Sequence, residues 1–262
     1  MGMGFALPDR LENYASFIQY GEEIMNISAT TKVRDIAIEF PQATRVLEKL
    51  KIDYCCGGDR PLGDACATAG VEMENLVELI VGAGKAEAGG RDFQQATLTE
   101  LIGYILDKHH VYTKDEMARL EPLAEKVLTA HGENHPELRE IRELLRELFI
   151  DLRQHMFKEE QVLFPFVVEL EKSQTQNRRP PFAPFGTVNN PIRMMSLEHD
   201  TAGDILRRLR KLSADYMAPA DGCLSYKTFY AALEAFEQDL HQHIHLENNL
   251  LFPKAVELEQ QF

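Results

Sequence analysis

The chain has 262 residues, a formal net charge of −14 at pH 7 and a pI near 5.1. This charge repels phosphate backbones and anionic lipid, so binding to nucleic acid or to a membrane surface is disfavoured. No stretch approaches the roughly 18 apolar residues of a membrane span, and no basic segment followed by an apolar run opens the chain. Four cysteines, two of them adjacent, do not resemble a disulfide framework. A cytoplasmic protein is therefore expected.

Residues 1–30 form an N-terminal extension to which the sequence assigns no structure, because a short helix and a disordered arm both remain open. From Thr31, apolar residues recur at helical spacing. The pattern is interrupted at Pro41, which suits the first turn of a second helix. Residues 31–81 are therefore predicted to form a small helical domain.

The helical pattern of this domain breaks at residues 52–62, where a Gly-Gly pair frees the backbone and Pro61 suits the start of another helix. An exposed loop is expected. Cys55 and Cys56 lie in it near a helix N-terminus, which favours the thiolate. Because a disulfide between adjacent cysteines is strained and easily reduced, the pair is a candidate for redox chemistry or iron transfer. Two partly buried thiols that shape a turn are the alternative.

Residues 82–96 are rich in glycine and alanine and are predicted to be a linker. Beyond it, Thr97 and Glu100 form a capping box that opens a helix running through His110. Three further helices are expected at about residues 137–172, 191–212 and 226–260. The sequence thus predicts an all-α protein in which residues 97–262 form an up-down four-helix bundle.

The predicted bundle contains an internal duplication. The eleven residues that begin at His155 and the eleven that begin at His243 share His, Glu, Leu, Phe and Pro in register. His110 lies 45 residues before the first copy, and His199 lies 44 residues before the second. Two equivalent helical hairpins are therefore expected.

This duplication predicts a metal site. Residues four apart share a helix face, so each copy points an imidazole and a carboxylate the same way. Converging buried polar groups are costly unless they are hydrogen-bonded or bind metal. Six nitrogen and oxygen donors exceed the needs of one tetrahedral zinc and suit two ions bridged by carboxylates. The predicted ligands are His110, His155, Glu159, His199, His243 and Glu247.

Imidazole and carboxylate ligands suit iron, although zinc and manganese remain alternatives. Two imidazoles and two carboxylate oxygens per ion leave octahedral positions for a solvent-derived oxo bridge and for a small ligand such as dioxygen or nitric oxide. Two non-haem iron ions, bridged by carboxylate and oxo groups, are therefore the expected cofactor.

The other histidines and cysteines lack this pattern. Surface positions are expected for His109, His131 and His135. Solvent exposure is also expected for His241 and His245, on the helix face away from His243, with adventitious metal binding as the alternative. Cys66 and Cys223 are expected to be small core residues.

Together these features resemble the iron-sulfur cluster repair di-iron proteins, which join a small ScdA-like cysteine-bearing domain to a hemerythrin-like four-helix bundle. The resemblance covers about residues 31–260 and rests on the segment Asp53–Gly58 and on the duplicated His-x-x-x-Glu-x-x-x-Leu-Phe-Pro motif. It implies di-iron ligands at the same six positions. It also implies a more open site than that of oxygen-carrying hemerythrins, which use five histidines.

The function implied by the resemblance is repair of iron-sulfur clusters damaged by oxidative or nitrosative stress, through iron donation or handling of nitric oxide. A homodimer that acts on damaged iron-sulfur proteins is the expected form. Two other functions remain open. One is an enzyme that reduces nitric oxide or peroxide at the two metals, with the cysteines as electron donors. The other is a module that senses dioxygen or nitric oxide.

Overall fold

The computed structural model describes residues 16–20, 23–86 and 93–262, and the chain divides into two compact units with the boundary between Gln94 and Gln95. Helices predominate in both units, which confirms the all-α class. Among the residues described, none of the helices has the length and apolar character that a bilayer crossing requires.

The first unit begins with a β-hairpin, which was not expected. Strand β1 (Ser16–Tyr20) pairs in antiparallel fashion with β2 (Glu23–Ile27), and Ser16 lies opposite Ile27. The described part of the extension at residues 1–30 is thus neither a helix nor an arm. Its apolar, β-branched and aromatic residues suit a hairpin, but apolar and polar residues do not alternate strictly along either strand, so the pattern of a strand is weak.

Four helices follow the hairpin and enclose a core of their own. They are α1 (Val33–Glu39), α2 (Ala43–Lys49), α3 (Leu62–Ala69) and α4 (Met73–Ala86). The core includes the fully buried side chains of Ile36, Leu47 and Leu76. Gly70 ends α3 in the left-handed conformation, with φ of 68°.

Helix α4 corrects one boundary. It continues through Gly82 to Ala86, five residues into the segment 82–96 that was expected to be a linker. Alanine and lysine are strong helix formers, and a glycine costs only about 1 kcal/mol inside a helix. Residues 87–92 of that segment lie outside the described residues.

The second unit consists of four long helical rods. The first comprises α5 (Leu98–Tyr104), the π turn η1 (Ile105–His110) and α6 (Val111–His131). The second comprises α7 (Glu137–Lys158), the π turn η2 (Glu159–Leu163) and α8 (Phe164–Thr175). The third is α9 (Asn189–Leu212). The fourth comprises α10 (Leu224–Leu246), the π turn η3 (Glu247–Leu251) and α11 (Phe252–Glu259).

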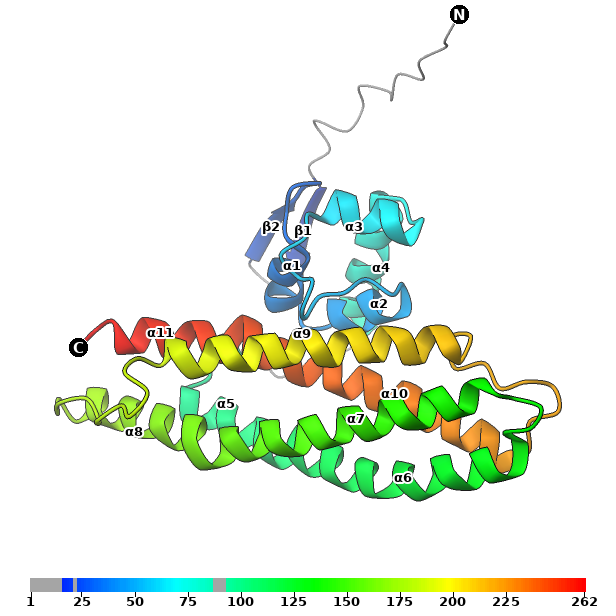
Figure 1. Ribbon diagram of the computed structural model, residues 1–262. Helices are drawn as coiled ribbons and strands as arrows, with labels where there is room; N and C mark the ends of the chain where they lie inside the picture. Colours follow the sequence, from blue (N-terminus) through cyan, green and yellow to red (C-terminus); the bar gives the residue numbers. More distant parts are fainter. Residues whose placement is uncertain (1–15, 21–22, 87–92) are drawn as a thin grey trace, which may run out of the picture. The chain divides into compact units, whose positions relative to one another are not determined.

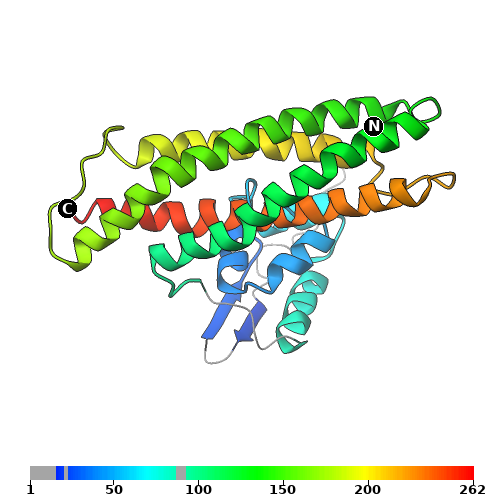
Figure 2. The ribbon, with the colours of Figure 1, turned by 90° about the horizontal axis from the view of Figure 1, so that it is seen from below.

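These rods form the predicted bundle. Figures 1 and 2 both show α6, α7, α9 and α10 running alongside one another, with successive rods joined at their ends. The expected capping box opens the first rod, where the Glu100 N–H donates to Thr97 Oγ1 at 3.1 Å and the Thr97 N–H donates to Glu100 Oε2 at 3.0 Å. That rod continues 21 residues beyond His110 and includes Pro122.

Candidate metal centre

Three of the six predicted ligands lie in the π turns of the bundle. Glu159 opens η2, Glu247 opens η3, and His110 closes η1. A π turn contains one residue more than an α-helical turn and is frequent at functional sites. The extra residue widens the helix at the point where the ligand side chain leaves it.

The Leu-Phe-Pro tail of the repeat accounts for two of these turns. The Phe164 N–H donates to the carbonyl of Glu159, five residues back, as a π turn requires. Pro165 follows and has no N–H to restore an α-helical bond. The second copy repeats the arrangement with Glu247, Phe252 and Pro253.

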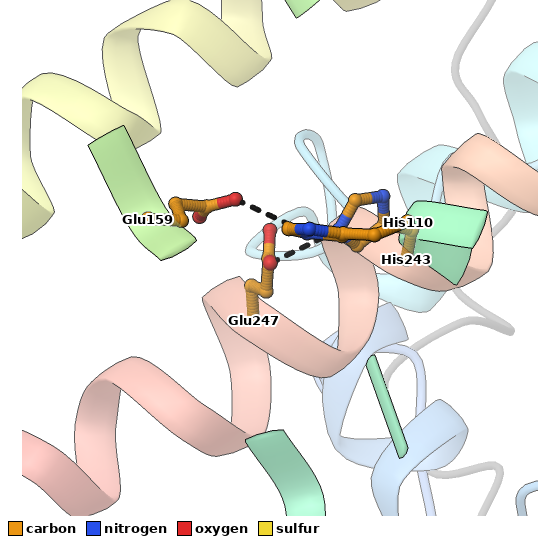
Figure 3. Close-up of side chains that lie close together, drawn as sticks. All are labelled: His110, Glu159, His243 and Glu247. Carbon is orange, nitrogen blue, oxygen red and sulfur yellow. Dashed lines mark hydrogen bonds and ion pairs between the residues drawn. The ribbon is translucent and has the colours of Figure 1, made fainter. Parts of the chain in front are cut away.

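The donor atoms of the six side chains form two overlapping groups. Within each group, one donor atom per residue lies within 4.8 Å of all the others. Both glutamates belong to both groups, which is the arrangement expected when two carboxylates bridge two ions. One group is His110, Glu159, His243 and Glu247 (Figure 3), and the other is His155, Glu159, His199 and Glu247.

Glu159 presents one oxygen to each group. Its Oε2 lies 3.4 Å from His110 Nε2, and its Oε1 lies 3.4 Å from His155 Nε2. The carboxylate is fully buried, yet among the residues described neither oxygen has a hydrogen bond of good geometry, and the same holds for His110 Nε2. Buried carboxylate oxygens without hydrogen bonds are costly, and a cation between them and the imidazoles removes that cost. The donor set therefore fits metal.

Glu247 mirrors this arrangement from the other hairpin. Its Oε1 lies 3.0 Å from His243 Nε2, and its Oε2 lies 3.1 Å from His199 Nε2. His199 Nε2 also lies 3.1 Å from His155 Nε2. The residues of this donor set are each at most 3% exposed, so the donors converge in the bundle interior as the duplicated sequence predicts.

Acceptors that the sequence analysis missed orient two of the histidines. His110 Nδ1 lies 2.7 Å from Glu160 Oε1, which also accepts from Lys114 Nζ at 2.6 Å. His155 Nδ1 lies 2.9 Å from Glu198 Oε2. A carboxylate at Nδ1 places the proton there and turns the Nε2 lone pair towards the metal.

Asn248 plays the same part for a third histidine, because its Oδ1 lies 2.9 Å from His199 Nδ1. Each of these acceptors is adjacent in sequence to a predicted ligand. Glu160 and Asn248 occupy equivalent positions in the duplicated motif, one residue after the ligand glutamate. The repeat therefore held a signal for Glu160 and Asn248, but none for Glu198.

Without metal the charges of the site compete. Burial acts to lower the pKa of His155, but Glu159 outweighs it and the pKa rises to about 10; that of His110 is raised in the same way. Burial acts to raise the pKa values of Glu159 and Glu247, but the histidines outweigh it and both are lowered. Burial lowers the pKa of His243. Metal binding must therefore displace protons from imidazole.

A cavity of about 180 Å³ lies beside the site. Three of the predicted ligands, His155, His199 and His243, form part of its lining. The rest includes the apolar side chains of Leu148, Leu152, Ile205, Leu240 and Ile244, together with the charged residues Asp151, Lys158 and Glu198. Such a cavity suits a small, weakly polar molecule next to the ligand imidazoles.

Two histidines that were expected at the surface are buried, so those expectations are wrong. His109 is 1% exposed, and its Nδ1 lies 3.1 Å from Asp239 Oδ1. His245 is 4% exposed, and its Nδ1 lies 2.8 Å from Asn249 Nδ2. Every residue from His243 to Leu246 is buried, so α10 has no exposed face here. His131, His135 and His241 are half-buried.

The loop at residues 52–62 is less exposed than expected. It buries Tyr54 and Cys55, and Asp53 Oδ1 accepts from the Cys55 N–H at 3.0 Å and from its thiol at 3.3 Å. The Cys55 and Cys56 Sγ atoms lie 3.9 Å apart, and both are free thiols. The thiolate expectation fails for Cys55, because the hydrogen bond with Cys56, burial and the charge of Asp53 raise the pKa of its thiol.

Close packing explains the Gly-Gly pair of this loop. A Cβ at Gly58 would lie 2.6 Å from the Tyr54 carbonyl oxygen and 2.8 Å from Arg34 Cβ. The Arg34 N–H donates to the Gly58 carbonyl at 2.9 Å, so the loop is held against α1. The glycines serve close approach of two backbone segments rather than freedom of the chain.

Cys66 is buried, as expected, but Cys223 is exposed and is not a core residue. Cys223 precedes the first residue of α10, and hydrogen bonds from His131 and from the Tyr226 and Ser225 N–H groups lower the pKa of its thiol to about 7. Thiolate is the reactive form, so its fraction rises as pH passes upward through about 7.

Cys223 should therefore be alkylated by iodoacetamide with a half-maximal rate near pH 7, far faster than Cys55. Peptide mapping of the intact protein at pH 6 to 9 resolves the individual thiols. In His131→Ala, the midpoint for Cys223 should move up towards the ordinary thiol range of about 8.5. A midpoint that stays at pH 7 in this variant would rule out the histidine as the main cause.

The fold and the site define a class: a four-helix bundle with a His/Glu donor set for metal, joined to a small Cys-Cys domain. The Hemerythrin HHE cation binding domain matches residues 101–255, and ScdA_N, a domain of unknown function (DUF542), matches residues 29–82. The hemerythrin match covers more than half of the chain, and described side chains of that domain could hold a metal ion.

Named relatives specify the family. The chain is 31% identical over 230 residues to a probable iron-sulfur cluster repair protein of Haemophilus influenzae, covering 87% of this chain and 97% of that protein. It is 33% identical over 221 residues to the iron-sulfur cluster repair protein YtfE of Yersinia pseudotuberculosis, and equally so to that of Yersinia pestis, covering 84% of this chain and 94% of each relative. The chain belongs to the family of iron-sulfur cluster repair proteins, as the resemblance implied.

Proposed function

We propose that this protein repairs iron-sulfur clusters damaged by oxidative or nitrosative stress, and that iron held in the bundle takes part in the repair. The observation that carries the proposal is the buried convergence of four imidazoles and two carboxylates from two equivalent hairpins. The names of the relatives support the same function. Damaged iron-sulfur proteins are then the partners.

The six converging side chains hold two iron ions in this proposal. His110 and His243 would bind one ion, His155 and His199 would bind the other, and Glu159 and Glu247 would contribute to both. Iron with mixed nitrogen and oxygen ligands supplies redox chemistry and open positions for small ligands. The chain orients the imidazoles through acceptors at Nδ1 and excludes bulk water by burial.

The cavity beside the ligands favours a second candidate, reduction of nitric oxide or peroxide at the same centre. Its apolar side chains and its volume of about 180 Å³ suit such small molecules, and it reaches three of the proposed ligands. Anaerobic turnover with excess reductant separates the two functions: a reductase, re-reduced after each cycle, forms nitrous oxide or water many times per site, and a repair protein does so at most once.

Cys55 and Cys56 take part in redox or iron transfer in this proposal. Of the two thiols, Cys56 is the more exposed, so Cys56 makes first contact with a client or an oxidant. The protein acts in the cytoplasm as a homodimer. Analytical ultracentrifugation of the full chain tests the dimer, and Cys56→Ser assayed for repair tests the thiol.

The central experiment compares repair by iron-loaded wild type and by His155→Ala. An enzyme whose [4Fe–4S] cluster has been damaged with nitric oxide or peroxide is incubated with each protein, and recovery of its activity is followed. Wild type should restore activity, and His155→Ala should not. His135→Ala is the matched control, because His135 is half-buried and pairs with Asp221 instead of the metal site. Equal repair by His155→Ala would contradict the proposal.

A further inference from the structure

The duplication allows each residue of the site to be compared with its counterpart in the other hairpin. The pairs of ligands and of their neighbours occupy equivalent positions in the two copies. They are His110 with His199, His155 with His243, Glu159 with Glu247, Glu160 with Asn248, His109 with Glu198, and Asp151 with Asp239. Any difference within a pair marks a difference between the two halves of the centre.

The outer hydrogen bonds are not equivalent. Nδ1 of His110, His155 and His199 has an acceptor in each case, from Glu160, Glu198 and Asn248 respectively. His243 Nδ1 is buried and forms no hydrogen bond with the described residues. One of the four imidazoles therefore lacks the partner that fixes the ring and raises its basicity.

Among the described residues, His243 Nδ1 lacks an acceptor because the position equivalent to Glu198 is occupied by a histidine. Glu198 serves His155, and its counterpart beside His243 is His109. The His109 and His243 rings lie nearly parallel, with centroids 5.6 Å apart and an interplanar angle of 9°. His109 Nδ1 faces Asp239 Oδ1 at 3.1 Å, while its Nε2 is buried and has no hydrogen-bond partner in the described part of the chain. The His109 ring therefore packs against the His243 ring but accepts no hydrogen bond from it.

From this asymmetry we propose that the iron held by His110 and His243 is the exchangeable ion of the pair, and that His109 is the residue that makes it so. The inference rests on the proposed function, since it takes the centre to hold two ions. Loss of an outer hydrogen-bond partner typically lowers metal affinity about 10- to 100-fold. The ion of His155 and His199, whose imidazoles both have acceptors, is the retained one.

The test is the release of iron from the full chain, loaded with two iron ions per chain, into an excess of ferrozine under anaerobic, reducing conditions. Absorbance of the chelator complex should show two phases of equal amplitude, with rates about 10- to 100-fold apart. Refilling the emptied position with ⁵⁷Fe should give one Mössbauer doublet. A single phase that accounts for both ions would overturn the proposal.

Variants identify the ion and the cause. His109→Glu and His109→Gln each offer His243 Nδ1 an acceptor, as Glu198 and Asn248 do for their histidines, and each should slow the fast phase while leaving the slow phase unchanged. Asn248→Ala should instead speed the slow phase. His243→Ala should retain one ion that leaves at the slow rate. An unchanged fast phase in both His109 variants, or a fast remaining ion in His243→Ala, would refute the assignment.

The same proteins separate this inference from the proposed function. If release is biphasic but His109→Glu repairs clusters as fast as wild type, the inequality of the two ions stands and repair by donation of the exchangeable iron fails. If release has one phase and wild type still repairs clusters, the inequality fails and the proposed function stands.

Discussion

Glu159→Ala should reduce the iron bound by the protein from two ions per chain to at most one. Glu159 contributes one oxygen to each group of donors, 3.4 Å from His110 Nε2 and 3.4 Å from His155 Nε2. Its removal leaves each ion with three protein ligands, loses a bridge between the two, and removes the charge that offsets two cations. Cluster repair should fall with the iron content.

Iron content is measured by elemental analysis after anaerobic loading, and the fold is checked by circular dichroism. Glu169→Ala is the matched control, since that glutamate lies on α8 beyond the same π turn, is 44% exposed and pairs with Arg178. It should bind two ions and repair clusters normally. Two tightly bound ions in Glu159→Ala would show that the glutamate does not bridge.

The positions of the donor residues could be predicted because they depend on periodicity alone. His155 and Glu159 are four residues apart, and their duplication at His243 and Glu247 fixed which faces must meet. Acceptors such as Glu198 could not be found in this way. Their role depends on which neighbouring rod they face, and a pattern along one helix carries no information about that.

The π turns mark a second limit. A pattern with a period of 3.6 residues predicts one uninterrupted helix over residues 137–172, and the extra residue at Glu159 leaves that pattern almost unchanged. The turn nevertheless holds one residue more than an α-helical turn, so it changes the direction in which the side chains after it point. His109, expected at the surface but buried, lies within such a turn, η1. His245 is buried for another reason, because the end of α10 has no exposed face.

The cysteine loop shows a third limit. The Gly-Gly pair correctly indicates an irregular backbone. A glycine pair can, however, be required either for a flexible chain or for close approach of two segments, and the sequence alone does not distinguish the two. Only the contact of Gly58 with Arg34 and Tyr54 distinguishes them. The sequence suggested that a helix N-terminus lowers the pKa of Cys55. In the structure the hydrogen bond with Cys56, burial and the charge of Asp53 raise it instead.

Phe149→Ala should destabilise the bundle by about 3–5 kcal/mol, the usual cost of truncating a fully buried phenylalanine. Phe149 is 0% exposed on α7, and its ring meets the Phe236 ring edge-on, with centroids 5.7 Å apart. Urea unfolding of the metal-free protein measures the change. Phe157→Ala, on the same helix but 65% exposed, should stay within about 0.5 kcal/mol of wild type.

This variant should still bind two iron ions, because Phe149 is not one of the six donor residues and the folded state keeps all of them. Iron binds the folded state far more tightly than the unfolded chain, so loading at about 1,000 times the dissociation constant should add about 4 kcal/mol of stability for each ion bound. Phe149→Ala and Glu159→Ala thus give opposite results: one loses stability and keeps the metal, and the other loses the metal and keeps its helices. If Phe149→Ala also failed to bind iron when folded, the core and the centre would not be separable, and the site would depend on packing well beyond its own ligands.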